Sequence, residues 1–202
     1  MLLAPEFHRL SHAFAIWQAF DPAVKTDLYS TAALAGDAFF LIDPIPLDPA
    51  AFQELHHGHR VGGILVSNAN HLRASADFAR LCRAPIHCAA VIAEQFGELQ
   101  VLRLSDGSEL AAGITSIELK GAAPGEFAFH FVEDGGAIVV GDALINIEPY
   151  GFALLPAKYC DNQKELKRSL QKLLHWPFER LLFAHGAPIL SRARERLENL
   201  LR

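Results

Sequence analysis

The side chains that most readily suggest chemistry in this sequence are its cysteines and a closely spaced group of histidines. The cysteines are Cys82, Cys88 and Cys160. Their number is odd and no pair has CxxC spacing, so they predict neither a disulfide framework nor a cysteine-rich zinc site, and we interpret them as free thiols. The histidines are His56, His57 and His59. They lie beside Gly58 at a predicted helix end, where imidazoles also bond to terminal carbonyls, so we interpret them as structural.

Other sequence patterns that would carry chemistry are missing. The chain has neither the glycine-rich loop that cradles phosphates nor the strained turn that presents a nucleophilic serine. Cys160 has no histidine close to it in sequence to activate its thiol. The sequence therefore predicts no reaction of either kind.

The composition predicts one compact domain over residues 1–202. Hydrophobic residues make up 51% of the 202 residues and charged residues 20%, which is enough to close a sizeable core. The formal charge of −5 and the pI near 6.0 give no basic footprint, so neither nucleic acid nor an anionic membrane is expected as a partner. The N-terminus does not resemble a signal peptide, and no apolar run is long enough to span a membrane, so we expect a cytoplasmic protein.

Turn residues and apolar spacing predict the strands and helices that must position any site. The predicted strands span residues 12–20, 27–34, 39–42, 64–66, 85–92, 100–104, 126–132, 137–140 and 181–183. The predicted helices span residues 48–58, 74–82, 161–174 and 191–201. Asp48 and Ser191 are the expected N-caps of the first and last helices, and Gly58 is expected to end the first. The lysines and arginines of the third helix are interpreted as its solvated face. This alternation predicts an α/β protein with a mixed sheet.

Four predicted strand ends carry polar residues or glycine in a specific order. They are Asp43, Ser67, Gly141-Asp142 and His185-Gly186. In order and spacing these positions resemble the metallo-β-lactamase superfamily, and the resemblance covers residues 27–185. It implies a four-layer αββα sandwich in which two mixed sheets are flanked by helices and the strand ends converge on one edge.

The segment that binds metal in that family is replaced in this chain. The family signature Thr-His-x-His-x-Asp-His corresponds to Ser67-Asn68-Ala69-Asn70-His71-Leu72-Arg73, and none of its four metal-binding positions is kept. A further histidine of the family corresponds to an alanine. The replaced positions are Asn68, Asn70, Leu72, Arg73 and Ala122. Only Asp142, which corresponds to the metal-bridging aspartate, and His185 retain ligand side chains.

The resemblance therefore implies a vestigial metal centre. A catalytic zinc ion commonly needs three protein donors and an open position for water, and two remaining ligands do not supply them. We expect no metal or other cofactor, and a protein that binds a small molecule or regulates rather than a standard zinc hydrolase. Asp43 is expected to brace the surrounding loops. Arg73 is expected to pair with Asp142, so that its guanidinium replaces the charge of the metal.

Two alternative hypotheses remain open. In the resembling loop the side chain of His71 points away from the centre, but a displacement by one residue would make it a third donor beside Asp142 and His185. The chain would then hold one zinc or other divalent ion and hydrolyse an ester or thioester, like glyoxalase II-like members of the family. The other alternative is an interaction module, such as a homodimer joined through an apolar surface.

Overall fold

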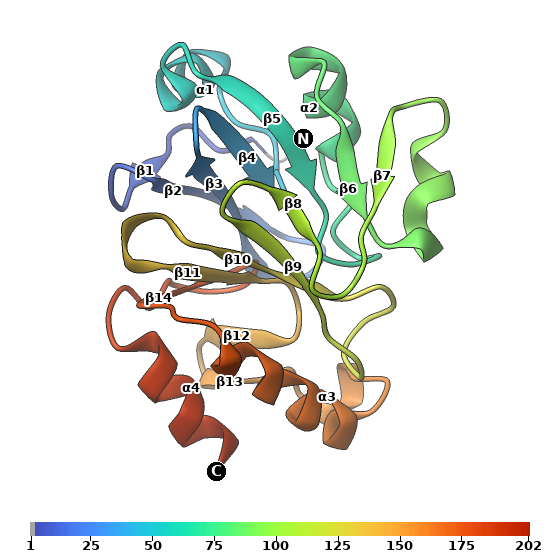
Figure 1. Ribbon diagram of the computed structural model, residues 1–202, viewed down its shortest axis with the longest axis vertical. Coiled ribbons are helices and arrows are strands. Elements are labelled where there is room, and N and C mark those ends of the chain that lie inside the picture. The colour runs from blue at the N-terminus through green and yellow to red at the C-terminus, as the bar shows by residue number, and fades with distance from the viewer. Residues whose placement is uncertain (1–2) are drawn as a thin grey trace.

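Two large β-sheets packed face to face form the centre of the computed structural model, which describes residues 3–202 (Figure 1). The first sheet has seven strands in chain order, which are β1 (His8–Arg9), β2 (Phe14–Asp21), β3 (Thr26–Ala35), β4 (Ala38–Ile42), β5 (Arg60–Leu65), β6 (Ile86–Cys88) and β7 (Val101–Arg103). The second sheet has five strands, in the order β14 (Arg180–Phe183), β11 (Ala137–Val140), β10 (Phe127–Phe131), β9 (Ile114–Glu118) and β8 (Glu109–Ala111). A separate antiparallel pair is formed by β12 (Leu144–Ile147) and β13 (Gly151–Leu154).

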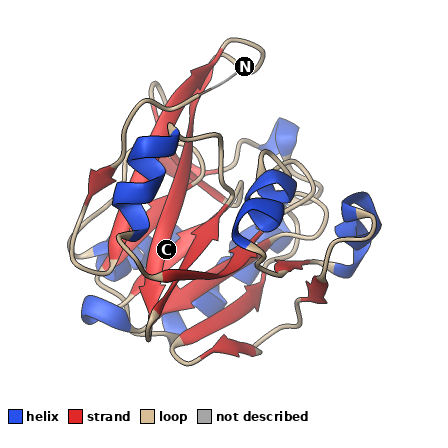
Figure 2. Cartoon of the chain, turned by 90° about the horizontal axis from the view of Figure 1, so that it is seen from above, coloured by secondary structure: helices blue, strands red, loops and turns tan. Residues whose placement is uncertain are grey.

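Helices cover the outer face of each sheet and complete four layers. Over the first sheet, toward the viewer in Figure 2, lie α1 (Pro49–His56) and α2 (Ser75–Cys82). Over the second sheet lie α3 (Gln163–Leu170) and α4 (Ala193–Leu201). The short 3-10 helices are η1 (Ala90–Phe96), η2 (Glu133–Gly135), η3 (Ala157–Tyr159) and η4 (Gln171–His175). Both large sheets are mixed, because β4 to β7 and the pair β11–β14 are parallel. The predicted αββα sandwich is confirmed.

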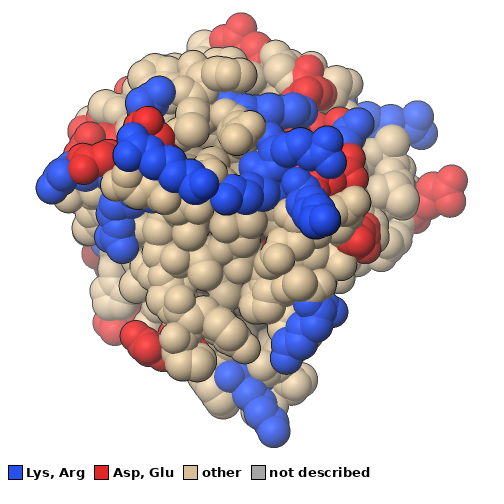
Figure 3. Space-filling view, turned by 90° about the horizontal axis from the view of Figure 1, so that it is seen from below, with Lys and Arg blue, Asp and Glu red and all other residues tan. Residues whose placement is uncertain are grey.

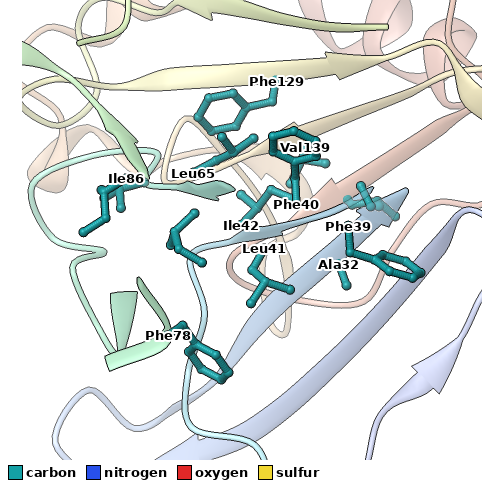
Figure 4. Close-up of a cluster of buried hydrophobic side chains, with 14 of the residues drawn as sticks. Ala32, Phe39, Phe40, Leu41, Ile42, Leu65, Phe78, Ile86, Phe129 and Val139 are labelled. Atoms are coloured by element: carbon teal, nitrogen blue, oxygen red, sulfur yellow. The ribbon is translucent and has the colours of Figure 1, made fainter. Parts of the chain in front are cut away.

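Alternating side chains along the inner strands build one apolar layer between the sheets and a second beneath α3 and α4. In β10, Phe129 and Phe131 belong to the cluster shared with the first sheet, whereas Ala128 belongs to the cluster under the helices. Figure 4 shows Phe129 and Val139 of the second sheet next to Phe40 of β4, in the layer between the sheets. Strands buried on both faces explain why these segments read as continuous apolar runs in the sequence.

The first helix begins as predicted. Asp48 accepts hydrogen bonds at Oδ1 from the backbone N–H groups of Ala50 (2.9 Å) and Ala51 (3.2 Å), and Pro49 occupies the first helical turn. The helix ends where His57 adopts a left-handed conformation with φ of 39°, one residue earlier than the predicted glycine.

Replacing Asp48 with alanine is expected to lower the free energy of unfolding by about 1 kcal/mol, because two N–H groups of the first turn lose their acceptor. Urea unfolding measures the change. Asp48→Asn keeps an acceptor oxygen and should cost much less, so equal losses in the two variants would contradict the capping role.

Two predicted element boundaries are wrong. Ser191 does not cap α4; instead Oε1 of Glu179, which precedes β14, accepts a hydrogen bond from the backbone N–H of Arg192 at 2.8 Å. The predicted strand over 85–92 is also too long, because only its first part forms β6 and the chain then turns into η1. A short apolar run by itself does not distinguish a strand from a buried helical segment.

The third helix turns its apolar side toward the second sheet and its charges toward solvent. Leu166 and Leu170 are buried, whereas Lys164 and Arg168 are exposed. Figure 3 views this end of the molecule and shows lysines and arginines mixed with acidic residues. The solvated face predicted for this helix is confirmed. Among residues 3–202, no helix has the length and apolar character needed to cross a membrane.

Candidate functional site

The candidate site lies where parallel strands of the two sheets end. Asp43 follows β4 and Ser67 lies just beyond β5 in the first sheet, while Asp142 lies just beyond β11 and His185 just beyond β14 in the second. The strands of each pair run parallel, so their carboxyl ends point the same way. Polar side chains that are far apart in sequence are thereby brought to one edge of the sandwich, as the order of strand ends predicts.

Asp43 fixes the loop that follows β5. Its Oδ1 accepts a hydrogen bond from the backbone N–H of Ser67 at 2.8 Å, and its Oδ2 lies 2.5 Å from the Ser67 hydroxyl oxygen, which donates to it. The same Oδ2 lies 2.9 Å from Nδ1 of His71. The bracing role predicted for Asp43 is confirmed, and the carboxylate also orients an imidazole.

Three side chains that can bind metal, those of His71, Asp142 and His185, meet beside Asp43. Nε2 of His71 lies 3.2 Å from Nε2 of His185 and 3.2 Å from Oδ1 of Asp142. Nε2 of His185 lies 3.2 Å from the same Oδ1. The three donor atoms therefore form a nearly equilateral triangle, and its corners come from the loops after β5, β11 and β14.

The expectation that His71 points away from the centre is wrong. The backbone N–H of His71 donates to the carbonyl of Asn68 at 3.2 Å, which folds the loop into a tight turn. Because Asp43 holds one nitrogen of the ring, the opposite nitrogen faces Asp142. The side chain is 3% exposed, so its position is set by buried contacts that the sequence pattern does not reveal.

The two asparagines at the family's histidine positions bind the other oxygen of Asp142. Nδ2 of Asn68 donates to Oδ2 of Asp142 at 3.2 Å, and Nδ2 of Asn70 donates to it at 3.0 Å. Oδ1 of Asn68 accepts from the backbone N–H of Asn70 at 2.8 Å, which fixes which end of this amide faces the carboxylate. Both residues thus lie in the centre, as the alignment to the family signature predicts.

The predicted pairing of Arg73 with Asp142 is wrong. Among residues 3–202 no hydrogen bond or ion pair joins them. The Arg73 guanidinium instead donates to the backbone carbonyls of Tyr29 (2.6 Å), Asp43 (2.9 Å) and Ala184 (3.4 Å). Asp142 is already surrounded by two amides and two imidazoles, whereas carbonyls at strand ends need buried donors. The guanidinium therefore joins the two sheets and does not replace a metal.

Two further positions of the predicted centre contribute no polar side chain to it. Leu72 is partly buried against the apolar cluster between the sheets. Ala122 is fully buried in the cluster beneath the second sheet, and its carbonyl accepts from the backbone N–H of Asp161 at 3.1 Å. These replacements therefore turn ligand positions into packing positions.

Sequence reasoning missed Glu126, which is 1% exposed beside the centre. Its Oε2 accepts from Nδ2 of Asn68 at 2.7 Å and its Oε1 from the backbone N–H of Ala143 at 3.1 Å. Burial, and then the charge of Asp142, raise the pKa of Glu126 to about 8. The available signal was a carboxylate directly before a strand that is apolar except for His130. A glycine at 141 is required here, because a Cβ would clash with the Ser67 hydroxyl and would also lie 2.8 Å from Nδ2 of Asn68 and 2.9 Å from Oε1 of Glu126.

Without a metal, opposite charges alternate through the centre. Burial and the charge of Arg73 oppose protonation of His71, but the carboxylates of Asp43 and Asp142 outweigh them and raise the pKa of His71 to about 9. Burial opposes ionisation of Asp142, yet the charge of His71 and hydrogen bonds from both histidines hold the pKa of Asp142 well below its usual range. Burial lowers the pKa of His185. At neutral pH His71 is therefore expected to be an imidazolium, which lies between the carboxylates of Asp43 and Asp142.

The same three residues fit one divalent metal ion. Donors about 2.0–2.2 Å from a tetrahedral zinc ion lie roughly 3.3–3.6 Å apart, close to the 3.2 Å sides of the triangle. Asp43 binds the remote nitrogen of His71, which is the outer contact that metal-binding histidines usually make. Nδ1 of His185 is buried and has no hydrogen-bond partner among the described residues. Two imidazoles and a carboxylate suit zinc or iron(II).

The remaining candidates from the sequence are structural. Burial raises the pKa of Cys82 and of Cys88 to about 11, and burial also raises the pKa of Cys160, so none is an activated thiolate. Nδ1 of His56 lies 3.1 Å from the carbonyl oxygen of His59 at the end of α1. The free-thiol interpretation is confirmed. The histidines lie at the end of α1 as expected, but the carbonyls that His56 and His59 contact belong to His59 and Asp37, outside the helix.

Several solved structures have the same fold as this chain. The DIM-1 metallo-beta-lactamase superposes with a TM-score of 0.73 at 12% identity and covers 98% of each chain. FIM-1 from Pseudomonas aeruginosa, in its mono-zinc form, has a TM-score of 0.72 at 13% identity, covering 100% of this chain and 96% of that one. A metallo-beta-lactamase family protein from Thermus thermophilus has a TM-score of 0.66 at 20% identity, covering 96% of this chain and 79% of that one. At sequence identities of 12%, 13% and 20%, the similarity between these proteins and this chain shows a shared fold alone.

The sequence comparison places the chain in a family. No curated protein matches it. The model of the metallo-beta-lactamase superfamily, however, matches residues 7–202 and so includes every strand of both sheets. The chain belongs to the metallo-β-lactamase superfamily.

Proposed function

We propose that this protein is a single-metal hydrolase of an ester or thioester, with one divalent ion held by His71, Asp142 and His185. The observation that carries the proposal is the triangle of three donor atoms, each 3.2 Å from the other two. Three protein donors plus an open position are what a catalytic zinc site commonly has. The contact between Asp43 and the remote nitrogen of His71 supports the same assignment. FIM-1, which shares the fold, is named as a mono-zinc form.

The chain's own residues would orient the reaction. When bound, the ion would supply Lewis-acid polarisation of the substrate carbonyl. Asp43 holds the His71 ring at one angle, and the two asparagine amides keep Asp142 from rotating. The side chain of His185 is 16% exposed, against 3% for His71 and 10% for Asp142. Substrate would therefore approach beside His185.

A second candidate function is a metal-free protein that binds a small molecule or regulates a partner. The observation that favours it is the position of His71 between the carboxylates of Asp43 (2.9 Å) and Asp142 (3.2 Å), which raise its pKa, so that an imidazolium would balance the centre without any metal. In that case the centre is vestigial as an enzyme site and its polar residues serve binding.

Metal content separates the two candidates. The chain of 202 residues, stripped with a chelator and dialysed against zinc, is expected to retain about one equivalent by elemental analysis. His185→Gln is expected to weaken zinc binding by at least about 100-fold. Even the loss of a group that only contacts a metal ligand lowers the metal affinity by about 10–100-fold. The control is His59→Gln, which changes an exposed histidine outside the triangle and should retain the metal.

Activity on thioester and ester substrates is measured on the same samples, and circular dichroism checks that each variant is folded. Turnover should follow the zinc content. A wild-type chain that retains neither zinc nor iron(II) would contradict the single-metal hydrolase and favour the metal-free candidate.

A further inference from the structure

We propose that the carboxamides of Asn68 and Asn70 hold the position beside Asp142 that a second cation would need, and so limit the centre to one divalent ion. This inference rests on the proposed single-metal function and specifies its stoichiometry. It concerns the side of Asp142 that faces away from the donor triangle.

The two oxygens of the Asp142 carboxylate have different surroundings. Oδ1 faces the two imidazole nitrogens of the triangle, at 3.2 Å from each. Oδ2 faces N–H groups only, from Asn68 at 3.2 Å and Asn70 at 3.0 Å. A carboxylate that bridges two ions through both of its oxygens needs an open lone pair on each oxygen. In this chain the second oxygen has amide hydrogens where the ion would be.

The orientation of the Asn68 amide is determined by its neighbours. Its Oδ1 accepts from the backbone N–H of Asn70 at 2.8 Å, so its oxygen is turned away from the carboxylates. Its NH2 group then lies between Asp142 and Glu126, 2.7 Å from Oε2 of the latter. An amide NH2 is a donor of two hydrogen bonds and offers no lone pair to a metal ion. The group that fills this position therefore excludes a cation.

Glu126, Leu72 and Ala122 do not offer substitute ligands. Both oxygens of Glu126 are used, one by Asn68 and the other by the backbone N–H of Ala143. Leu72 and Ala122 carry no donor atom and pack in the two apolar clusters. A second ion would therefore have to displace two amide hydrogen bonds and would gain a single carboxylate oxygen in return.

Isosteric substitutions test the inference. In the double variant Asn68→Asp, Asn70→Asp, each NH2 becomes an oxygen of similar size, so the hydrogens facing Oδ2 of Asp142 are replaced by metal ligands. Zinc titration of the chelator-stripped chain, read by elemental analysis and by the shift in melting temperature, should give one equivalent for the wild type and two for the double variant. The control Asn162→Asp adds one negative charge at the exposed N-cap of α3, outside the donor triangle, and so matches the charge of the single variant Asn70→Asp; it should stay at one equivalent.

The outcomes separate this inference from the proposed function. A wild-type chain that takes up no zinc overturns the proposed function and the inference with it. A wild-type chain that binds two equivalents, or a folded double variant that still binds one, overturns only the inference. Should the double variant fail to fold, Asn70→Asp alone serves, because Asn70 is exposed. It should show a second, weaker zinc-binding event, and a titration that stops at one equivalent would overturn the inference.

Discussion

Replacing Arg73 with alanine is expected to lower the free energy of unfolding by about 3–5 kcal/mol, the range for breaking a buried charged contact. The guanidinium donates to carbonyls that follow or belong to β3, β4 and β14, and so connects the first sheet to the second. Without it, all three carbonyls lose the guanidinium as a donor in a partly buried place, although the Asp43 carbonyl keeps the Ser30 hydroxyl and the Ala184 carbonyl keeps the Tyr29 N–H. Asp43 also loses a neighbouring positive charge. Urea unfolding of the chelator-treated chain measures the loss.

Two further variants define the origin of that effect. Arg73→Lys keeps the charge but has no planar fork to reach several carbonyls, so it is expected to recover only part of the stability. Arg80→Ala removes an exposed arginine of α2 that pairs with Asp77, and such surface pairs contribute about 0–1 kcal/mol. An Arg73→Ala variant as stable as Arg80→Ala would contradict the role of Arg73 in joining the sheets.

The metal-free chain is expected to lose several kcal/mol of stability as the pH rises from about 6.5 to 9. The pKa of His71 is about 9 in the folded chain and 6.5 ordinarily. Protonation of His71 therefore stabilises the fold fully below pH 6.5, and this stabilisation, about 3 kcal/mol, is lost as the pH rises through 9. Glu126 acts in the same direction, because its pKa is about 8 against an ordinary 4.5.

The carboxylates that pair with His71 act at the opposite end of the pH range. The pKa values of Asp43 and Asp142 are lowered, so their contribution is present above their ordinary values and is lost only in acid. Urea unfolding in chelator across pH 5–9 follows His71 and Glu126, because the two aspartates titrate below this range. His71→Gln should remove much of the fall above pH 6.5, whereas His57→Gln, at an exposed helix end, should leave it unchanged. A wild-type stability that is constant from pH 6.5 to 9 would contradict the charge assignment.

The frame of the site could be predicted from the sequence, because it depends on local patterns. Each of the strand ends at Asp43, Ser67, Asp142 and His185 follows an apolar run. A run of this kind marks a strand with buried side chains, so it can be recognised in the sequence. The order and spacing of those ends resemble the metallo-β-lactamase superfamily, and that resemblance implied the αββα sandwich. The replacement of ligands at Leu72 and Ala122 was also readable directly, since no side-chain conformation can make a hydrocarbon into a metal ligand.

The sequence alone thus determined the family, the four-layer fold and the positions that no longer carry metal ligands. Only the tertiary structure decided where the remaining polar groups point. His71 meets Asp43 across 28 residues and His185 across 114, and its ring orientation depends on those two contacts rather than on its place in the motif. The Arg73 guanidinium contacts backbone carbonyls instead of Asp142, because Asp142 already accepts hydrogen bonds from Asn68 and Asn70. Competition between buried donors and acceptors is settled only when all of them are in place, and for that reason no local pattern predicts its outcome.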